Sequence, residues 1–214
     1  MTDQIQGYAS VLQLSREDIH TLKVYDAYSL HRVVYGLFPM NNENREQGRS
    51  DSSGFLYADD GEQEGVRQII MVSRSKPHET PQFGKVKTAP IQEKFFSYDR
   101  YAFEIMVSPS RRSRETGKVT AIKDKEDIAR WFTEKLRVAG AAVGENEFQV
   151  ERVSVQQFQK KDYTVTHGVA RLRGVLTVVN RREFADLFFR GIGRGKAFGL
   201  GLLKVSPFYQ QENK

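Results

Sequence analysis

The stretch Arg182–Val205 reads REFADLFFRGIGRGKAFGLGLLKV and passes from a helical segment through a glycine-rich one to an apolar one. Arg182–Arg190 predicts a short helix, because Gly191 follows it and helices commonly end at such a glycine. The segment 191–201 holds five glycines in eleven positions. Small residues let a backbone approach another surface closely, so we expect a tight loop between this helix and a last strand.

The segments upstream of this stretch complete a regular order of strands and helices. We expect an amphipathic helix at Asp124–Ala139. We expect strands at Tyr101–Val107, Phe148–Val155, Tyr163–Val169 and Arg171–Val179. The last two strands are expected to pair, with Gly168 near their bend. The order strand, helix, strand, strand, helix, strand is that of a ferredoxin-like unit, whose antiparallel sheet is a common platform for RNA.

The first half of the chain can be interpreted in the same way. Tyr8–Leu14 alternates as a strand, and Asp26 is a natural N-cap for a helix that Pro39 ends. The apolar positions of this helix recur with helical spacing and are Leu30, Val33, Val34 and Leu37. One face of the helix is therefore expected to be buried, while the other carries Tyr28, His31 and Arg32.

The middle of the chain predicts a division into two domains. Met40–Gly65 is polar and indicates a flexible loop with one short strand, followed by a strand at Val66–Ser73. A linker is then marked by Pro77, Pro81, Gly84 and Pro90. We predict an α+β protein of two tandem ferredoxin-like (βαββαβ) domains with antiparallel sheets, residues 1–90 and 91–214.

The composition limits the possible chemistry. The chain has 214 residues and no cysteine, which excludes disulfides, thiolate zinc sites and cysteine nucleophiles. No segment approaches the roughly 20 consecutive apolar residues of a membrane span, and the N-terminus lacks the apolar run of a secretory signal. We expect a soluble, cytoplasmic protein that does not bind a membrane.

The positive charge is concentrated at the C-terminal end. Residues 151–214 contain 12 Lys and Arg and 5 Asp and Glu, which gives +7, whereas residues 1–150 carry −1 of the net +6. A basic surface attracts phosphate backbones through Coulomb attraction and counterion release. Composition alone leaves two interpretations open, a nucleic-acid-binding protein and a protein that merely has a high pI.

The glycine-rich segment does not match the common nucleotide-cofactor motifs. A dinucleotide fingerprint requires a glycine where Lys196 stands, and a P-loop requires Ser or Thr where Ala197 stands. Two interpretations remain. The segment is either a tight connection between helix and strand or a cradle for an RNA backbone, with Arg194 and Lys196 projecting from it.

Four motifs in this chain resemble those of the CasE family, the CRISPR RNA endoribonucleases of type I-E systems within the Cas6 superfamily. The segment Gly191–Pro207 closely resembles the family's C-terminal signature, in which a glycine-rich loop leads into a Gly-Leu-Gly-Leu-Leu strand. The other three are Tyr28-Ser29-Leu30-His31-Arg32 with Leu37-Phe38-Pro39, Ser108-Pro109 with the basic residues that follow, and Val169–Val178. Related enzymes also occur in type IV systems, so the host complex stays open.

The resemblance implies that His31 takes part in cleavage and that Tyr28 assists it. RNA can cleave itself when a 2′-hydroxyl attacks the adjacent phosphate, so an enzyme need only align that attack and manage protons, for which histidine is well suited. Spacing of three residues places both side chains on one helical face. We expect no metal and no cofactor, since no pair of histidines has H-x-x-x-H spacing. His20, His78 and His167 are interpreted as structural or surface residues.

The implied partners are the CRISPR repeat RNA hairpin, in precursor and mature guide RNA, and the subunits of a multisubunit CRISPR effector complex. The expected RNA-binding residues are Arg32, Arg111, Arg112, Arg114, Lys118, Lys160, Lys161, Arg194 and Lys196, with the loop glycines Gly191, Gly193, Gly195, Gly199 and Gly201. Lys160 and Lys161 are expected at a hairpin tip. The alternative function is a non-catalytic subunit that holds the RNA hairpin.

Overall fold

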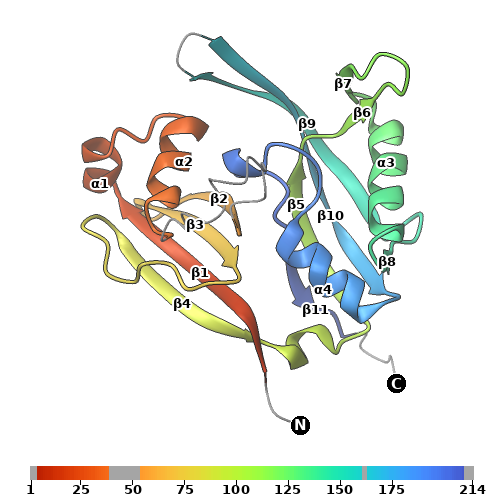
Figure 1. Ribbon diagram of the computed structural model, residues 1–214, viewed down its shortest axis with the longest axis horizontal. Helices are drawn as coiled ribbons and strands as arrows, with labels where there is room; N and C mark the ends of the chain where they lie inside the picture. The colour runs from red at the N-terminus through yellow and green to blue at the C-terminus, as the bar shows by residue number, and fades with distance from the viewer. Residues whose placement is uncertain (1–3, 39–53, 161–162, 210–214) are drawn as a thin grey trace.

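The computed structural model describes residues 4–38, 54–160 and 163–209. Two antiparallel sheets dominate it (Figure 1). The first has the order β2-β3-β1-β4 and consists of β1 (Ile5–Ser15), β2 (Phe55–Gln63), β3 (Val66–Ser73) and β4 (Lys85–Gln92). The second has the order β11-β5-β10 with β8 and β9 paired to β10, and consists of β5 (Arg100–Val107), β8 (Ala141–Ala142), β9 (Phe148–Lys160), β10 (Tyr163–Val178) and β11 (Lys204–Pro207). A small hairpin joins β6 (Ser110–Arg112) to β7 (Val119–Ala121).

The helices begin at side chains that cap their first turns. The expected cap Asp26 precedes α2 (Ala27–Tyr35), Asp124, which was expected to begin its helix, caps α3 (Lys125–Arg137), and Asn180 precedes α4 (Arg181–Arg190). Each cap accepts a hydrogen bond from a backbone N–H that lacks a partner within the helix. The shorter elements are α1 (Arg16–Thr21) and the 3₁₀ turns η2 (Glu93–Phe96) and η3 (Lys196–Phe198).

The second half has the expected ferredoxin-like order. β5, α3, β9, β10, α4 and β11 follow one another, and both helices pack on one sheet face, where Phe103 contacts Phe132 and Tyr101 contacts Phe184. The first sheet has the corresponding strand order. However, residues 74–84 between β3 and β4 form no helix. This connection is short and contains Pro77 and Pro81, which do not favour a helix interior.

Three local predictions were wrong. Tyr163–Val178 is one continuous strand, because β9 continues to Lys160 and Gly168 pairs with Val155 inside the ladder instead of bending it. The region predicted as a loop with one short strand contains the nine-residue strand β2; residues 40–53 of that region lie outside the described residues. The predicted linker contains β4, whose Pro90 is tolerated because β4 is an edge strand. The predicted boundary between residues 90 and 91 falls inside β4, which runs to Gln92. The domain limits 1–90 and 91–214 stay a prediction.

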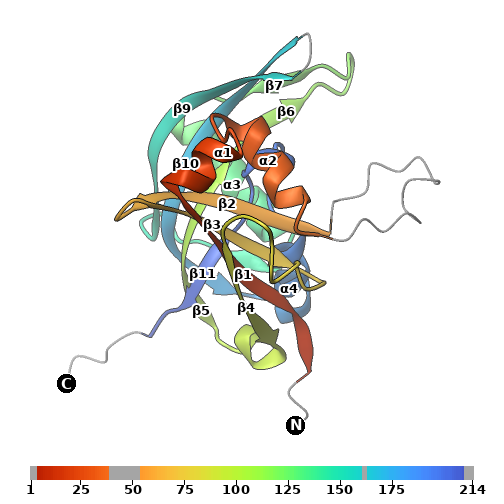
Figure 2. The ribbon, with the colours of Figure 1, turned by 90° about the vertical axis from the view of Figure 1, so that its left-hand side faces the viewer.

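The first sheet is buried on both faces. One face packs on α2 in a cluster that includes Leu12, Leu30 and Val34. The opposite face carries residues such as Val72 that join the core of the second half. Figure 2 shows α1 and α2 on the outer side of the first sheet and α4 beyond its other side. The two halves therefore share a core and hold α2 in a fixed position beside the glycine-rich loop.

Candidate active site

One face of α2 carries three ring side chains side by side. The ring of His31 is 6.1 Å from that of Tyr28, with the planes nearly parallel, and 3.9 Å from that of Tyr35. Leu30 and Val34 on the opposite face are buried in the core and fix the rotation of the helix. The predicted pairing of Tyr28 and His31 on one helical face is therefore found in the structure.

The glycine-rich loop folds back on itself through conformations that favour glycine. All five of its glycines have positive φ, from 71° to 85°. Ile192 N–H donates to the carbonyl of Gly201 at 2.9 Å, and Gly201 N–H donates to the carbonyl of Met106 at 2.6 Å. A Cβ on Gly201 would lie 2.5 Å from the Ile192 carbonyl oxygen. The loop is thus tied to itself and to β5, and it presents η3 toward α2.

The loop and α2 meet at a single carbonyl group. Nδ1 of His31 lies 2.7 Å from the Ala197 carbonyl oxygen, and the hydroxyl of Tyr57 donates to the same oxygen at 2.9 Å. A carbonyl only accepts, so Nδ1 of His31 carries the hydrogen in this contact, and Nε2 is the nitrogen that accepts a proton in the neutral ring. Burial raises the pKa of Tyr57 far above its ordinary value, so its hydroxyl stays a donor.

Phe198 extends this cluster to the second sheet. Its ring lies 5.5 Å from that of His31, 4.4 Å from that of Phe158 on β9 and 5.8 Å from that of His167 on β10. Burial, with a smaller effect of the Arg194 charge, lowers the pKa of His167. His167 is half-buried in this cluster, whereas His20 and His78 are exposed and lie elsewhere.

The expected RNA-binding residues lie in separate places. Arg111, Arg112, Arg114 and Lys118 are all exposed on the β6–β7 hairpin. Arg194 is exposed and Lys196 half-buried on the glycine-rich loop. Arg32 is exposed and lines a different hollow beside Gly36 and Pro81, so the structure does not bring it to the loop.

The β9–β10 hairpin carries the expected basic pair. β9 ends at Lys160, whose partner in the ladder is Tyr163. The side chain of Lys160 and the whole of Lys161 lie outside the described residues.

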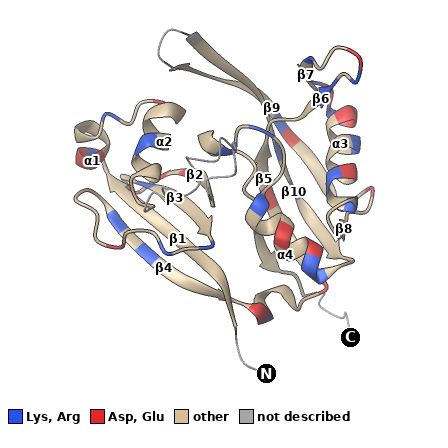
Figure 3. Cartoon of the chain, in the orientation of Figure 1, with Lys and Arg blue, Asp and Glu red and all other residues tan. Residues whose placement is uncertain are grey.

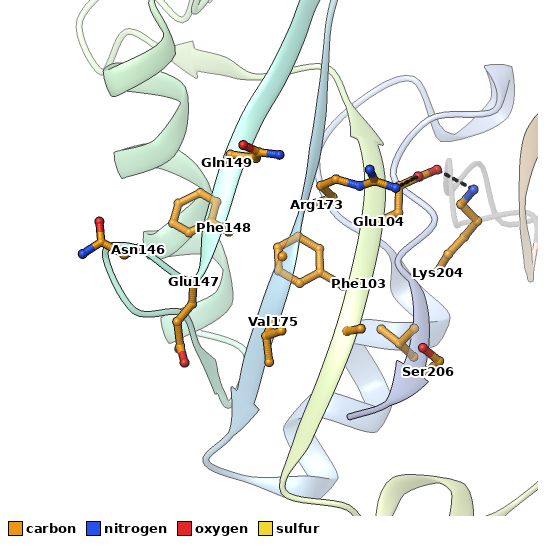
Figure 4. Close-up of a pocket in the computed structure, with 13 residues that line it drawn as sticks. Phe103, Glu104, Asn146, Glu147, Phe148, Gln149, Arg173, Val175, Lys204 and Ser206 are labelled. Carbon is orange, nitrogen blue, oxygen red and sulfur yellow. Dashed lines mark ion pairs between the residues drawn. The ribbon is translucent and has the colours of Figure 1, made fainter. Parts of the chain in front are cut away.

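A pocket on the open face of the second sheet is electrically balanced (Figure 4). Its two cations, Arg173 and Lys204, both contact Glu104, at 3.7 and 2.6 Å. Burial alone would raise the pKa of Glu104, but hydrogen bonds from Lys204 and Arg171 outweigh it and lower that pKa. Because these cations already have carboxylate partners, this sheet face offers little net charge to a phosphate.

Two kinds of feature are absent from residues 4–38, 54–160 and 163–209. No group of three or more His, Asp or Glu side chains among them is arranged to hold a metal ion. Within those same ranges, no helix has the length and apolar character needed to cross a membrane.

The sequence did not reveal several members of this cluster. Tyr35 could have been found, because it lies four residues after His31 on the same helical face. Tyr57 could not have been found, since it follows a polar stretch. The Ala197 carbonyl could not have been found either, since it is a backbone group 166 residues from His31. Their approach depends on the packing of the two halves.

Comparison with known proteins places this arrangement in a family. The CRISPR-associated endoribonuclease Cse3 of Thermus thermophilus is 30% identical over 118 residues, which are 50% of this chain and 56% of that protein. The match thus spans about half the length of this curated relative. A structure of Thermus thermophilus Cse3 bound to an RNA representing a pre-cleavage complex has a TM-score of 0.76 at 22% identity, and a chain of a CRISPR RNA-guided surveillance complex has 0.68 at 15%. Each of these covers 94% of this chain and 100% of the other, and they establish the fold. A model of the family described as CRISPR associated protein matches residues 8–207, and the chain therefore belongs to that family.

Proposed function

We propose that this protein is a metal-independent endoribonuclease that cleaves CRISPR repeat hairpins in precursor CRISPR RNA and stays bound to the 3′ hairpin of the mature guide. The observation that carries the proposal is the contact of His31 with the glycine-rich loop, because it joins the two motifs that most resemble the CasE family. The names of the similar proteins, an endoribonuclease and a structure with a pre-cleavage RNA, support it.

In the proposed reaction, the RNA supplies its own nucleophile. The 2′-hydroxyl oxygen forms a bond to the adjacent phosphorus while the bond from phosphorus to the 5′-oxygen breaks. The proton of the 2′-hydroxyl leaves to a base, and the departing 5′-oxygen receives one. The products are a 2′,3′-cyclic phosphate and a 5′-hydroxyl.

His31 performs one of these proton transfers through Nε2, because its contact with Ala197 engages Nδ1. Tyr28 orients the scissile phosphate or the attacking hydroxyl from the same helical face. Tyr57 is a positioning residue, which holds the Ala197 carbonyl where it accepts from His31.

The RNA stem is held by cations on two hairpins. A-form stems hide base edges in a deep, narrow groove, so shape and phosphates dominate their recognition. The β6–β7 hairpin contributes Arg111, Arg112, Arg114 and Lys118, and the end of the β9–β10 hairpin contributes Lys160 and Lys161. The further partners proposed are the subunits of a multisubunit CRISPR effector complex, as the likeness to a chain of a surveillance complex suggests.

Cleavage of repeat RNA by purified protein in EDTA tests the proposal. We expect wild-type protein to cut and His31→Ala to bind the same RNA without cutting it. The exposed His20→Ala variant is the matched control and should cut normally. Binding without cleavage by the wild-type protein would instead support the alternative, a non-catalytic RNA-hairpin-binding subunit. Cleavage by His31→Ala at the wild-type rate would contradict the assignment of His31.

A further inference from the structure

A further hollow adjoins the glycine-rich loop, which contacts His31 through Ala197. It has a volume of about 350 Å³ and is bounded by the C-terminal ends of α3 and α4 and by residues 191–196. Four cations line it, namely Lys135, Arg190, Arg194 and Lys196, and no carboxylate is among its lining residues. Blue segments on α3, on α4 and on the loop after α4 mark Lys and Arg in this region (Figure 3).

The four cations form no ion pair among the described residues, although the charge of Lys135 acts on the neighbouring Glu134, which pairs with Arg137. The ammonium group of Lys135 lies 6.0 Å from the centre of the Trp131 ring. Burial, and then the charge of Arg190, lowers the pKa of Lys196. The mutual repulsion of these four positive charges opposes folding. In the pocket around Glu104, by contrast, the two cations contact a carboxylate. Such an arrangement favours an anionic ligand.

The loop connects this hollow to the candidate active site. Ala197 accepts from His31, while its neighbour Lys196 lines the hollow. Ser110, the first residue of the basic β6–β7 hairpin, also lines the hollow, and Ser108 forms a β-bridge with Arg194. The hollow therefore lies between His31 and that hairpin.

We propose that this hollow binds a backbone phosphate of the single RNA strand that leaves the hairpin beside the scissile bond. The proposal rests on the proposed function and adds Lys135 and Arg190, two helix residues that were not among the expected RNA-binding residues, to the RNA-binding set. A hollow of about 350 Å³ admits a phosphate with its ribose, whereas a base-paired duplex is too wide to enter it. Arg190 and Arg194 offer planar groups that bind phosphate oxygens in pairs.

The test compares two RNAs and two double variants. The RNAs are the repeat hairpin alone and the same hairpin with single-stranded flanks, and binding is measured in the His31→Ala background so that neither is cut. The test variant is Lys135→Gln with Arg190→Gln. The control is Lys125→Gln with Arg182→Gln, which removes equal charge from exposed positions at the opposite ends of the same two helices.

We expect the test variant to bind flanked RNA roughly tenfold more weakly, and the slope of log affinity against log salt to fall by about 0.7, for one phosphate contact with a single strand. Its affinity for the bare hairpin should equal that of the control. Equal weakening for both RNAs would assign the residues to the stem, and equal affinity of test and control variants for flanked RNA would show that they do not contact it. Either result overturns the proposal.

Thermal denaturation checks that the variants are folded. If the double variant unfolds early, the single variants Lys135→Gln and Arg190→Gln are measured in the same way, each with an expected slope change of up to about 0.7. The failure of this proposal and the failure of the proposed function give different results. A failed phosphate contact leaves cleavage at saturating RNA intact, whereas a wrong assignment of His31 leaves cleavage in His31→Ala.

Discussion

His31 and Ala197 are 166 residues apart, yet Nδ1 of the histidine lies 2.7 Å from the carbonyl oxygen of the alanine. The histidine belongs to the first half of the chain and the alanine to the second. The orientation of the proposed catalytic imidazole is therefore a property of the assembled molecule. Anything that moves the glycine-rich loop should change the cleavage rate without removing a group that contacts RNA.

Tyr57→Phe tests this dependence directly. The change removes the hydroxyl that donates to Ala197 and leaves the buried ring in place. We expect the single-turnover cleavage rate to fall roughly ten- to a hundredfold with little change in RNA affinity, because small misplacement of a reacting group is costly. Nitrogen chemical shifts of His31 should report a mixture of imidazole tautomers in the variant.

The exposed residue Tyr25 provides the control, as Tyr25→Phe removes the same hydroxyl at a distance from the loop. An unchanged rate in Tyr57→Phe, with His31→Ala inactive, would show that Tyr57 does not position the histidine.

Gly201→Ala should destabilise the loop more than its change in size suggests. Gly201 has φ of 85°, and its added Cβ would meet the Ile192 carbonyl 2.5 Å away. We expect a loss of roughly 2–4 kcal/mol in the free energy of unfolding, which combines backbone strain with a clash. Gly61→Ala is the matched control, because Gly61 has φ of 83° and no neighbour within 4 Å. It should lose only about 1 kcal/mol, and equal losses would exclude the clash.

The sequence predicted the elements that local patterns determine. Asp26 predicted the start of its helix, the amphipathic pattern of Asp124–Ala139 predicted another helix, and Tyr28 and His31 lie on one face because spacing alone places them there. The predicted bend at Gly168 was wrong because Gly168 lies inside a long paired ladder. The predicted linker at Pro90 was wrong because a sheet edge tolerates proline. The partners of His31 were not predictable, since they come from tertiary packing across the two halves.

Lys204→Met should weaken the junction of the two sheets. Lys204 on β11 contacts Asp60 of β2 at 2.5 Å and Glu104 of β5 at 2.6 Å, and its loss leaves two partly buried carboxylates facing each other. We expect the free energy of unfolding to fall by about 1–2 kcal/mol near pH 7.

The penalty of Lys204→Met should depend on pH. The folded-state pKa of Glu104 is lowered from 4.5, so the stability it contributes is present above pH 4.5 and lost as pH falls through the folded value. Urea denaturation at neutral and acidic pH measures this. A penalty that is as large in acid as at neutral pH would mean that Lys204 acts through packing of its aliphatic chain.

His167 should make the stability of the protein sensitive to mild acid. Burial lowers its folded-state pKa below 6.5, so the unfolded chain binds the proton more readily. The stability that depends on neutral His167 is thus present above pH 6.5 and lost as pH falls toward the folded value. Denaturation midpoints of His167→Gln should therefore change less between these values than those of the wild type, with exposed His20→Gln as control. Identical pH dependence in all three proteins would show that His167 takes up its proton as readily in the folded chain as in the unfolded one.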